Sequence, residues 1–317
     1  MSTLQHSEPV SRAAAPPDAP PPRWRLRPRR TGGSGFPFVV PFLVFFVLFL
    51  LVPIGYGIWM SFTDAALTGQ GDGELVGFGN YAEALTDPEV WRTLGNTVVY
   101  TVLAGVPMVV VPLAMALLVN THMPAQWLWR LSFFAPYLLP VAVMTLIWTW
   151  LYQPDLGLFN QVLGAFGMEK AGWLTDKQLA MASIALASMW WHAGFNFLLY
   201  LAALQGIPDH LHEAASIDGA GAWRRLWSVT LPQLRHVTGV IAALQVMNSM
   251  KVFEQIYLLT KGGPDGSTRS VLGYVFDTGF TGYRLGYAAA ISNLFFALIV
   301  IVSLAQVKFS PRKEDQD

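Results

Sequence analysis

The chain has 317 residues, of which 53% are apolar and only 13% are charged, and its formal net charge is zero. A soluble domain usually carries about 25% charged residues, so much of this protein's surface is expected to lie away from water. The absence of cysteine excludes disulfides, thiol catalysis and cysteine-ligated metals. Nothing in the charge pattern suggests the basic face that nucleic-acid binding needs. Composition therefore predicts a polytopic membrane protein.

Stretches without charged residues define the expected membrane spans. A helix needs about 20 apolar residues to cross about 30 Å of hydrocarbon. On this basis we predict an all-α fold with six transmembrane helices, at about 36–62, 93–119, 131–152, 181–205, 237–259 and 286–307. Lys251 and Glu254 interrupt the fifth. Several spans contain proline, and neighbouring helices can satisfy the carbonyl groups that proline leaves free.

The distribution of lysine and arginine predicts that both termini are cytoplasmic. With that orientation, thirteen basic residues lie in the inner segments 1–35, 120–130, 206–236 and 308–317. Only six lie in the outer segments 63–92, 153–180 and 260–285. The Ala-, Pro- and Arg-rich composition of residues 1–35 cannot bury a core, so we expect a disordered cytoplasmic tail there.

The inner segment 206–236 is too polar to span a membrane and has the pattern of two short helices. Pro208 and the acidic residue after it suit the first turn of a helix. Gly219 is expected to end this helix, since glycine readily takes the left-handed conformation. A second helix is expected over 222–229, with Pro232 stopping it. These residues alone leave two interpretations open: a docking surface for another protein, or a helix pair that only anchors the loop.

The same loop carries a recognisable motif. Its residues are Glu213, Ala214 and Ala215, then Asp218, Gly219 and Ala220, and finally Leu231 and Pro232. This pattern resembles the EAA loop of ABC importer permeases, whose first helix docks into a cleft on the nucleotide-binding subunit. The resemblance implies that these residues couple the chain to a separate ATPase, through a loop between the fourth and fifth spans.

Further landmarks are similar to those of the carbohydrate-uptake branch of that family. They are Gly77–Tyr81, Trp91 with Asn96 and Thr97, Gly172–Asp176, and Leu259–Pro264 followed by Thr268 and Tyr274. The resemblance implies a type I, binding-protein-dependent importer of di- or oligosaccharides. It implies a first helix with its external loop over 36–92, a permease domain over 93–307 and a cytoplasmic tail over 308–317. Gly262, Gly263 and Pro264 have a plain interpretation as a tight turn, and contact with a binding protein is the other.

The resemblance also implies partners and a location. It implies a heterodimer with a second homologous permease, two ATPase subunits that bind Mg-ATP, and an extracytoplasmic sugar-binding protein, all at the bacterial inner (plasma) membrane. The chain has no phosphate-binding loop sequence and no other catalytic motif. We therefore expect a subunit that is not an enzyme and holds no cofactor, with no nucleic-acid partner.

The residues that pass the sugar are expected inside the fourth and fifth spans, because a sugar needs polar groups and aromatic faces near the midplane. The candidates are Ser188, Trp191, His192, Phe195, Asn196, Gln245, Asn248 and Ser249. Hydrogen bonding between helices is the alternative role for the polar ones. Lys251 and Glu254 are expected on one face of the fifth helix, as an ion pair or as gating groups.

The competing function is an ion-coupled secondary carrier. Such a carrier needs carboxylates within its spans as ion sites, and only Glu254 comes near that description. A membrane scaffold that transports nothing is a third class, but it would not need a docking loop.

Overall fold

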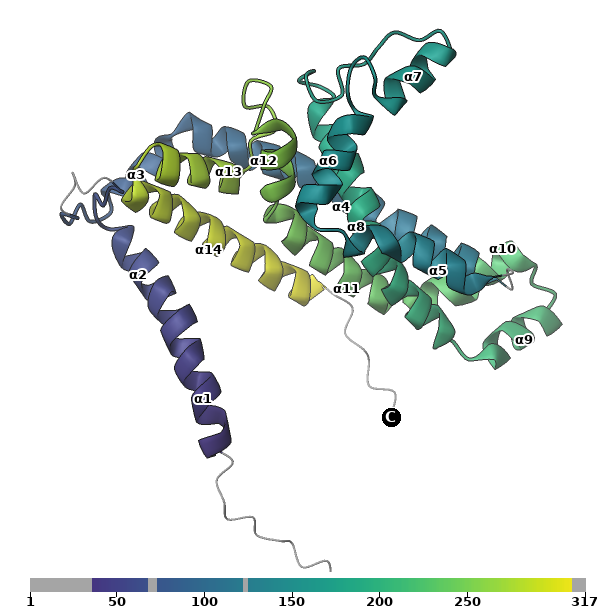
Figure 1. Cartoon of the computed structure of the whole chain (residues 1–317). Coiled ribbons are helices and arrows are strands. Elements are labelled where there is room, and N and C mark those ends of the chain that lie inside the picture. Colours follow the sequence, from purple (N-terminus) through teal and green to yellow (C-terminus); the bar gives the residue numbers. More distant parts are fainter. Residues whose placement is uncertain (1–35, 68–72, 122–124, 310–317) are drawn as a thin grey trace, which may run out of the picture. The chain divides into compact units, whose positions relative to one another are not determined.

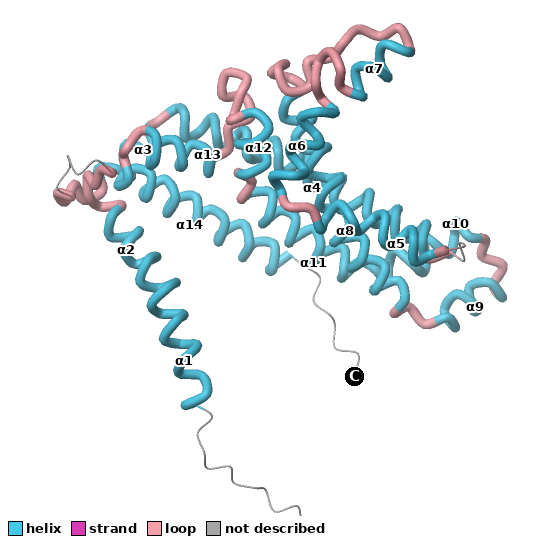
Figure 2. Tube along the Cα trace, in the orientation of Figure 1, coloured by secondary structure: helices cyan, strands magenta, loops and turns pink. Residues whose placement is uncertain are grey.

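The computed structural model describes residues 36–67, 73–121 and 125–309, and within these ranges it contains helices and two isolated bridges but no strands (Figure 2). The expected tail over 1–35 and all but the first two residues of the tail over 308–317 lie outside the described residues. The chain divides into two units at Pro53.

The predicted first span is an unbroken helical stretch. It consists of α1 (Phe36–Phe46), a π-helical turn (Val47–Leu51) and α2 (Val52–Met60). The π turn lies just before Pro53, which has no N–H and whose ring collides with the carbonyl of a regular helix four residues earlier. Widening the turn relieves that collision.

Three helices form the centre of the second unit: α4 (Pro88–Val119), α8 (Ala180–Gln205) and α11 (Leu231–Met250) (Figure 1). The predicted helix over 181–205 is confirmed by α8. Helix α4 begins before the predicted residue 93 because Asp87 caps it, with Oδ1 accepting a 2.8 Å hydrogen bond from the N–H of Glu89.

Aliphatic and aromatic side chains fill the space between these three helices. One buried cluster consists of Ala116, Val119, Phe197, Tyr200, Leu201, Leu204, Leu234 and Ile241. Its members come from all three helices, so the packing of α4, α8 and α11 against one another provides a continuous apolar core.

The prediction that residues 131–152 form a single helix is wrong. The chain forms α5 (Gln126–Phe134), a 3₁₀ turn (Ala135–Leu138) and α6 (Val141–Leu151), with a bend of 100° between the two parts. Pro140 explains the break, because a residue before proline is driven out of the helical conformation. Leu139 is accordingly extended, with ψ of 136°.

The predicted stop at Pro232 is also wrong. Helix α10 (Ala222–Arg225) runs through a second π-helical turn (Leu226–Thr230) directly into α11. As at Pro53, the widened turn lies just before the proline, so the helical path continues.

The predicted fifth helix over 237–259 is two helices. Helix α11 ends at Met250, and α12 (Glu254–Thr260) begins after a short break. The hydroxyl of Ser249 donates hydrogen bonds to the carbonyl oxygens of Gln245 and Val246, an arrangement that weakens and bends helices. Phe253 leaves the helical conformation and packs its ring against Phe276 and Tyr257.

The remaining elements are α3 (Gly79–Thr86), α7 (Leu158–Ala165), α9 (Asp209–Ile217), α13 (Val271–Phe276) with a π turn (Asp277–Thr281), and α14 (Leu285–Phe309). By length and composition, four stretches of the described residues can cross a membrane: Phe38–Met60, Pro88–Val119, Ala180–Gln205 and Leu285–Gln306. The bent pair α5–α6 makes a fifth if it is one broken span. Helix α11 is not among them.

Candidate functional site

A cavity of about 70 Å³ lies where α4, α8 and the end of α11 meet. Its lining residues are Tyr100, Met108, His192, Gln245, Asn248, Ser249, Lys251, Val252 and Gln255. Five of the residues singled out in the sequence therefore come together here: His192, Gln245, Asn248, Ser249 and Lys251. The lining carries hydroxyl, amide and imidazole groups as well as the ammonium of Lys251, and all of these are hydrogen-bonding partners for a polar ligand.

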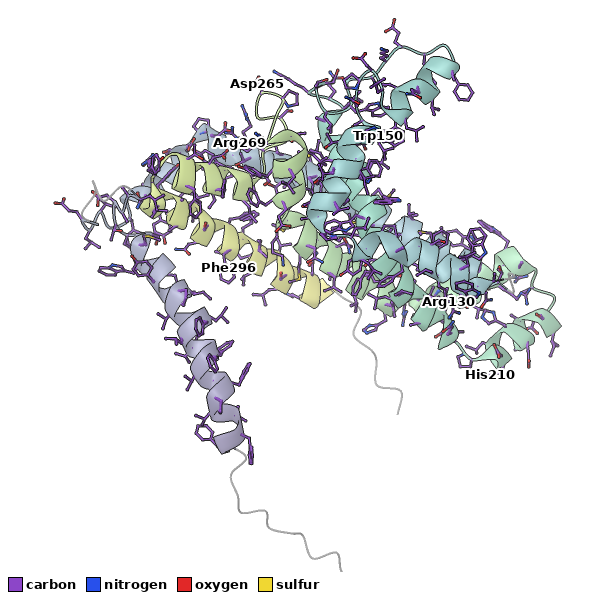
Figure 3. The ribbon with its side chains drawn as sticks, in the orientation of Figure 1. Arg130, Trp150, His210, Asp265, Arg269 and Phe296 are labelled. Atoms are coloured by element: carbon purple, nitrogen blue, oxygen red, sulfur yellow. The ribbon has the colours of Figure 1, made fainter. Side chains whose placement is uncertain are left out.

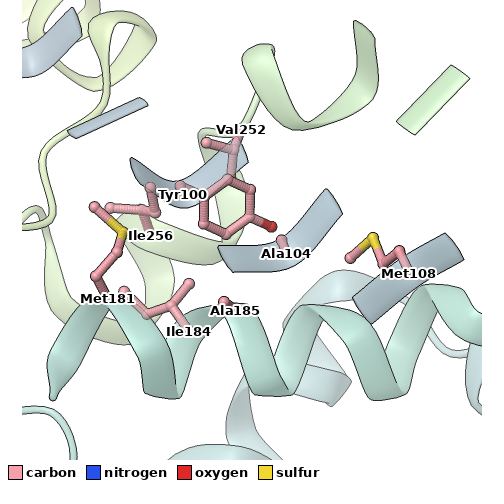
Figure 4. Packing of buried hydrophobic residues seen from close by; sticks show 8 residues of the cluster. All are labelled: Tyr100, Ala104, Met108, Met181, Ile184, Ala185, Val252 and Ile256. Carbon is pink, nitrogen blue, oxygen red and sulfur yellow. The ribbon is translucent and has the colours of Figure 1, made fainter. Parts of the chain in front are cut away.

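The other four lining residues were missed by sequence reasoning. Tyr100 and Met108 belong to a buried cluster between α4 and α8 that also includes Val252 (Figure 4). Val252 and Gln255 come to the cavity only because the chain breaks after Met250. The one signal in the sequence for these four residues was Tyr100, a tyrosine within the apolar run of α4. Nothing in the sequence marked the break after Met250.

Asn196 does not line the cavity but is fully buried beside it, between two residues that do. Its Nδ2 donates a 2.8 Å hydrogen bond to the main-chain oxygen of Met108, and its Oδ1 accepts one of 3.2 Å from Nε2 of Gln245. Pro112 stands four residues after Met108 and has no N–H to offer that oxygen. One side-chain amide thus joins α4, α8 and α11 at the point where a proline has left a carbonyl free.

The three other candidates on α8 do not line the cavity. Trp191 donates its indole N–H to the oxygen of Leu139 at 2.9 Å, which satisfies a carbonyl at the bend between α5 and α6. Phe195 stacks on Tyr137 in the same bend, with 5.5 Å between the ring centres. Ser188 is completely buried. Trp191 and Phe195 therefore hold the bent segment against α8.

Lys251 and Glu254 do not lie on one helix, contrary to the expectation from their spacing. Lys251 follows the last residue of α11, whereas Glu254 is the first residue of α12. Among the ion pairs of the described residues, none joins the two side chains. Lys251 lines the cavity, and Glu254 does not.

The loop between α12 and α13 is a tight turn fastened to α4. Gly262 has a φ of +83°, which favours glycine, and the Gly263–Pro264 peptide is cis. Asn96 of α4 donates hydrogen bonds to the oxygens of Gly266 and Arg269 at 2.9 and 3.0 Å. The tight-turn interpretation of Gly262, Gly263 and Pro264 therefore fits the geometry.

The same loop also carries a charged contact. Asp265 at its tip pairs with Lys177 at 2.6 Å, and both side chains are largely exposed. Figure 3 labels Asp265 and Arg269 in this loop. An exposed ion pair of this kind contributes little stability, so the hydrogen bonds from Asn96 and from Arg92 of α4 contribute more to holding the loop.

A half-buried carboxylate joins three helix ends near this loop. Asp87 accepts hydrogen bonds from the hydroxyls of Tyr274 at 2.6 Å and Tyr287 at 2.8 Å. Burial opposes the ionisation of Asp87, but these two bonds and the N–H of Glu89 outweigh it and hold the pKa of Asp87 below its usual value. Burial, together with the Asp87 carboxylate, raises the pKa of Tyr274 to about 12.

The loop with the EAA motif forms two helices, α9 and α10, joined by a turn. Gly219 has a φ of +77° and ends α9, in agreement with the sequence-based expectation. Glu213, Ala214, Asp218 and Gly219 are exposed, whereas Ala215 and Ala220 are half-buried. Ile217 leaves 87% of its surface exposed. The loop therefore presents an apolar side chain between acidic ones.

One hydrogen bond ties the two helices of this loop together. Arg225 of α10 donates to the hydroxyl of Ser216 in α9 at 2.9 Å. Leu231 and Pro232 follow as the first residues of α11. Helices α9 and α10 lie at the beginning of α11, and the turn at Gly262 follows its other end (Figure 1). The two loops are therefore at opposite ends of the helix that lines the cavity.

Comparison with known proteins identifies the family. The family described as "Binding-protein-dependent transport system inner membrane component" matches residues 96–315. The chain belongs to this family. Its members are non-catalytic inner membrane components of binding-protein-dependent ABC transport systems, so this permease is a multi-pass membrane protein and not an enzyme.

Three relatives match this permease over most of its length. It is 32% identical to the sulfoquinovosyl glycerol transport system permease protein SmoG of Agrobacterium fabrum, over 87% of this chain and 90% of that protein. It is 31% identical to the trehalose/maltose transport system permease protein MalF of Thermococcus litoralis, over 90% and 96%. It is 30% identical to the arabinooligosaccharides transport system permease protein AraP of Bacillus subtilis, over 86% and 87%.

The permease also shares its fold with a solved structure. A bacterial ABC transporter involved in the import of the acidic polysaccharide alginate contains a chain that matches with a TM-score of 0.77 and 23% identity. The match covers 87% of this permease and 94% of that chain. At this level of identity the likeness establishes the ABC permease fold.

Proposed function

We propose that this permease forms half of the translocation pathway of an ATP-driven importer for di- or oligosaccharides. The observation that carries the proposal is the cavity between α4, α8 and α11, whose hydroxyl, amide and imidazole groups match the hydrogen-bonding needs of a sugar. The names of three relatives, which refer to a glycosyl glycerol, disaccharides and oligosaccharides, support the same class. At about 70 Å³ the cavity is far below the usual size of a ligand pocket, so the second subunit and an opening movement must complete it.

The proposed topology has six spans with both termini in the cytoplasm. In addition to the four long apolar helices, α5–α6 forms the third span and α11 with α12 the fifth. The excess of lysine and arginine in the inner segments supports this orientation. Residues 36–92 then comprise the first span with its external loop, 93–307 the permease domain and 308–317 a cytoplasmic tail.

The loop from Glu213 to Pro232 is the proposed contact with the ATPase. Two ATPase subunits, which bind Mg-ATP, would each receive a loop of this type, one from this chain and one from an unlike homologous permease. The exposed Ile217 beside Glu213 and Asp218 supports this role, because it offers an apolar anchor with an acidic rim. At the opposite end of α11, the turn at Gly262 and Pro264 is the proposed contact for the sugar-binding protein.

The test is sugar uptake by the complete transporter reconstituted in vesicles with its binding protein. We expect uptake from a panel of disaccharides that requires ATP and stops when the catalytic residue of the ATPase is replaced. Uptake that survives this replacement refutes the proposal and favours the ion-coupled carrier. A transporter with wild-type ATPase but without the binding protein is the matched control, and its uptake should fall to background.

A further inference from the structure

The amide of Asn196 connects two walls of the cavity without being part of either. It donates to the main-chain oxygen of Met108 on α4 and accepts from the side chain of Gln245 on α11. Met108 and Gln245 line the cavity, whereas Asn196 is fully buried. Asn196 thus lies where it controls the orientation of a lining residue.

The orientation of the Gln245 side chain depends on this contact. A glutamine amide has two donors and two acceptor sites on a flexible stem, so an unanchored amide can rotate and exchange its oxygen and nitrogen. The hydrogen bond to Oδ1 of Asn196 commits Nε2 to the helix junction. The amide oxygen of Gln245, on the other side of the amide from that bond, is then free to accept from a ligand, as the second N–H of Nε2 is free to donate.

The backbone around Gln245 is held as well. The hydroxyl of Ser249 donates to the main-chain oxygen of Gln245 at 2.7 Å, and Ser249 also lines the cavity. With its amide nitrogen bonded to Asn196, Gln245 presents a preorganised acceptor.

We propose that Asn196 is a positioning residue for substrate recognition, acting through Gln245. It holds the Gln245 amide so that its oxygen accepts a hydrogen bond from one hydroxyl group of the transported sugar. The inference rests on the proposed function, since it needs a sugar in this cavity.

Asn196 also stabilises α4 by binding the Met108 oxygen. A substitution at Pro112 separates this structural role from the positioning role. An Asn196→Val variant leaves both the Met108 oxygen and the Gln245 amide without their partner. Adding Pro112→Ala restores a backbone N–H at residue 112. In a regular α-helix this N–H donates to the oxygen of Met108, four residues earlier. The double variant therefore repairs α4 while Gln245 stays unanchored.

The measured quantity is the ratio of uptake of the best disaccharide from the panel to uptake of each of its monodeoxy analogues. The same binding protein is present in every reaction, so a change in this ratio arises in the permease. Wild type is expected to disfavour one analogue by about two- to tenfold, the range for a single hydrogen bond. The double variant should recover the thermal stability of wild type but lose this preference.

Gln245→Leu provides a second measurement that leaves the bond between Asn196 and Met108 intact. The Gln245→Leu variant is expected to lose the preference for the same hydroxyl. Combining it with Asn196→Val and Pro112→Ala should not lower the uptake ratio further. A preference that persists in Gln245→Leu, or that returns in the double variant together with stability, overturns the inference. Wild-type transporter that takes up no sugar overturns the proposed function and the inference with it.

Discussion

The hydroxyl of Tyr274 donates a 2.6 Å hydrogen bond to Oδ2 of Asp87, the residue that caps the start of α4. Tyr287, in the first turn of α14, donates to the same oxygen at 2.8 Å. One carboxylate therefore joins α4, α13 and α14 at the end of the molecule that also carries the turn at Gly262.

Replacing Asp87 with asparagine should destabilise the permease by about 1 kcal/mol, because a charged acceptor of three hydrogen bonds becomes a neutral one. The measurement is thermal unfolding of the complete transporter purified in detergent. Asp64→Asn, at an exposed position, is the matched control and should leave the unfolding temperature nearly unchanged. Equal effects of the two substitutions would contradict the role of Asp87.

The stabilisation by Asp87 should depend on pH with a defined sign. Its pKa in the folded protein is below its usual value of about 3.9. The contribution is therefore fully present above that pH and is lost as the pH falls through the folded pKa. The difference in unfolding temperature between wild type and Asp87→Asn should shrink below about pH 4. A difference that stays constant from pH 7 to pH 3 would argue against an ionised, bonded carboxylate.

Gly194 should tolerate no side chain, because α8 passes the bent segment very closely there. A Cβ atom at Gly194 would lie 2.5 Å from the oxygen of Phe133 and 2.8 Å from the Cα of Phe134. Gly194→Ala is expected to cost about 1–3 kcal/mol, since only the backbone can move away. The control is Gly105→Ala in α4, where a Cβ meets no atom within 4 Å and should stabilise the helix by about 0.5–1 kcal/mol. Unfolding temperatures that shift in the same direction would refute this distinction.

Gly219→Ala should weaken the coupling of ATP hydrolysis to uptake. The left-handed conformation at φ +77° costs alanine about 1–2 kcal/mol, so the turn between α9 and α10 would be populated at least about fivefold less. Gly221→Ala is the control, since that residue has a φ of −66° and open space around it. The measurement is sugar taken up per ATP hydrolysed, and an equal ratio in both variants would count against a coupling role for the turn.

Charge reversal should distinguish the two roles considered for Lys251 and Glu254. Because Lys251 lines the cavity and forms no ion pair with Glu254, the first residue of α12, Lys251→Glu should reduce uptake and adding Glu254→Lys should not restore it. The coupling energy from a double-mutant cycle is expected to stay below about 0.5 kcal/mol. A value above about 1 kcal/mol would re-establish the ion pair.

Sequence alone predicted those parts of the fold that depend on local properties. Helix α8 was found within one residue because its charge-free run has clear ends. The end of α9 was found because the left-handed turn at Gly219 needs glycine. The start of α4 was missed by several residues, although Asp87 and Pro88 form a visible capping signal.

The breaks in the third and fifth predicted helices depend on contacts that sequence does not reveal. Pro140 marks the first break in the sequence itself. The carbonyl of Leu139 at that break, however, is bound by the indole N–H of Trp191, which comes from another helix. No proline or glycine marks the second break, where Phe253 packs on Phe276 instead. Residues of the cavity such as Val252 depend on that break and could not have been placed.

The unbroken helical path from Ala222 to Met250 has a mechanical consequence. It extends about 40 Å at 1.5 Å per residue, from the exposed turn that follows Gly219 to the wall that carries Gln245. In the coupling role proposed for the turn, a push along the axis of this helix would arrive at the cavity as movement of Gln245 and Ser249. The same helix thus carries the proposed ATPase contact at its start and a wall of the cavity near its end.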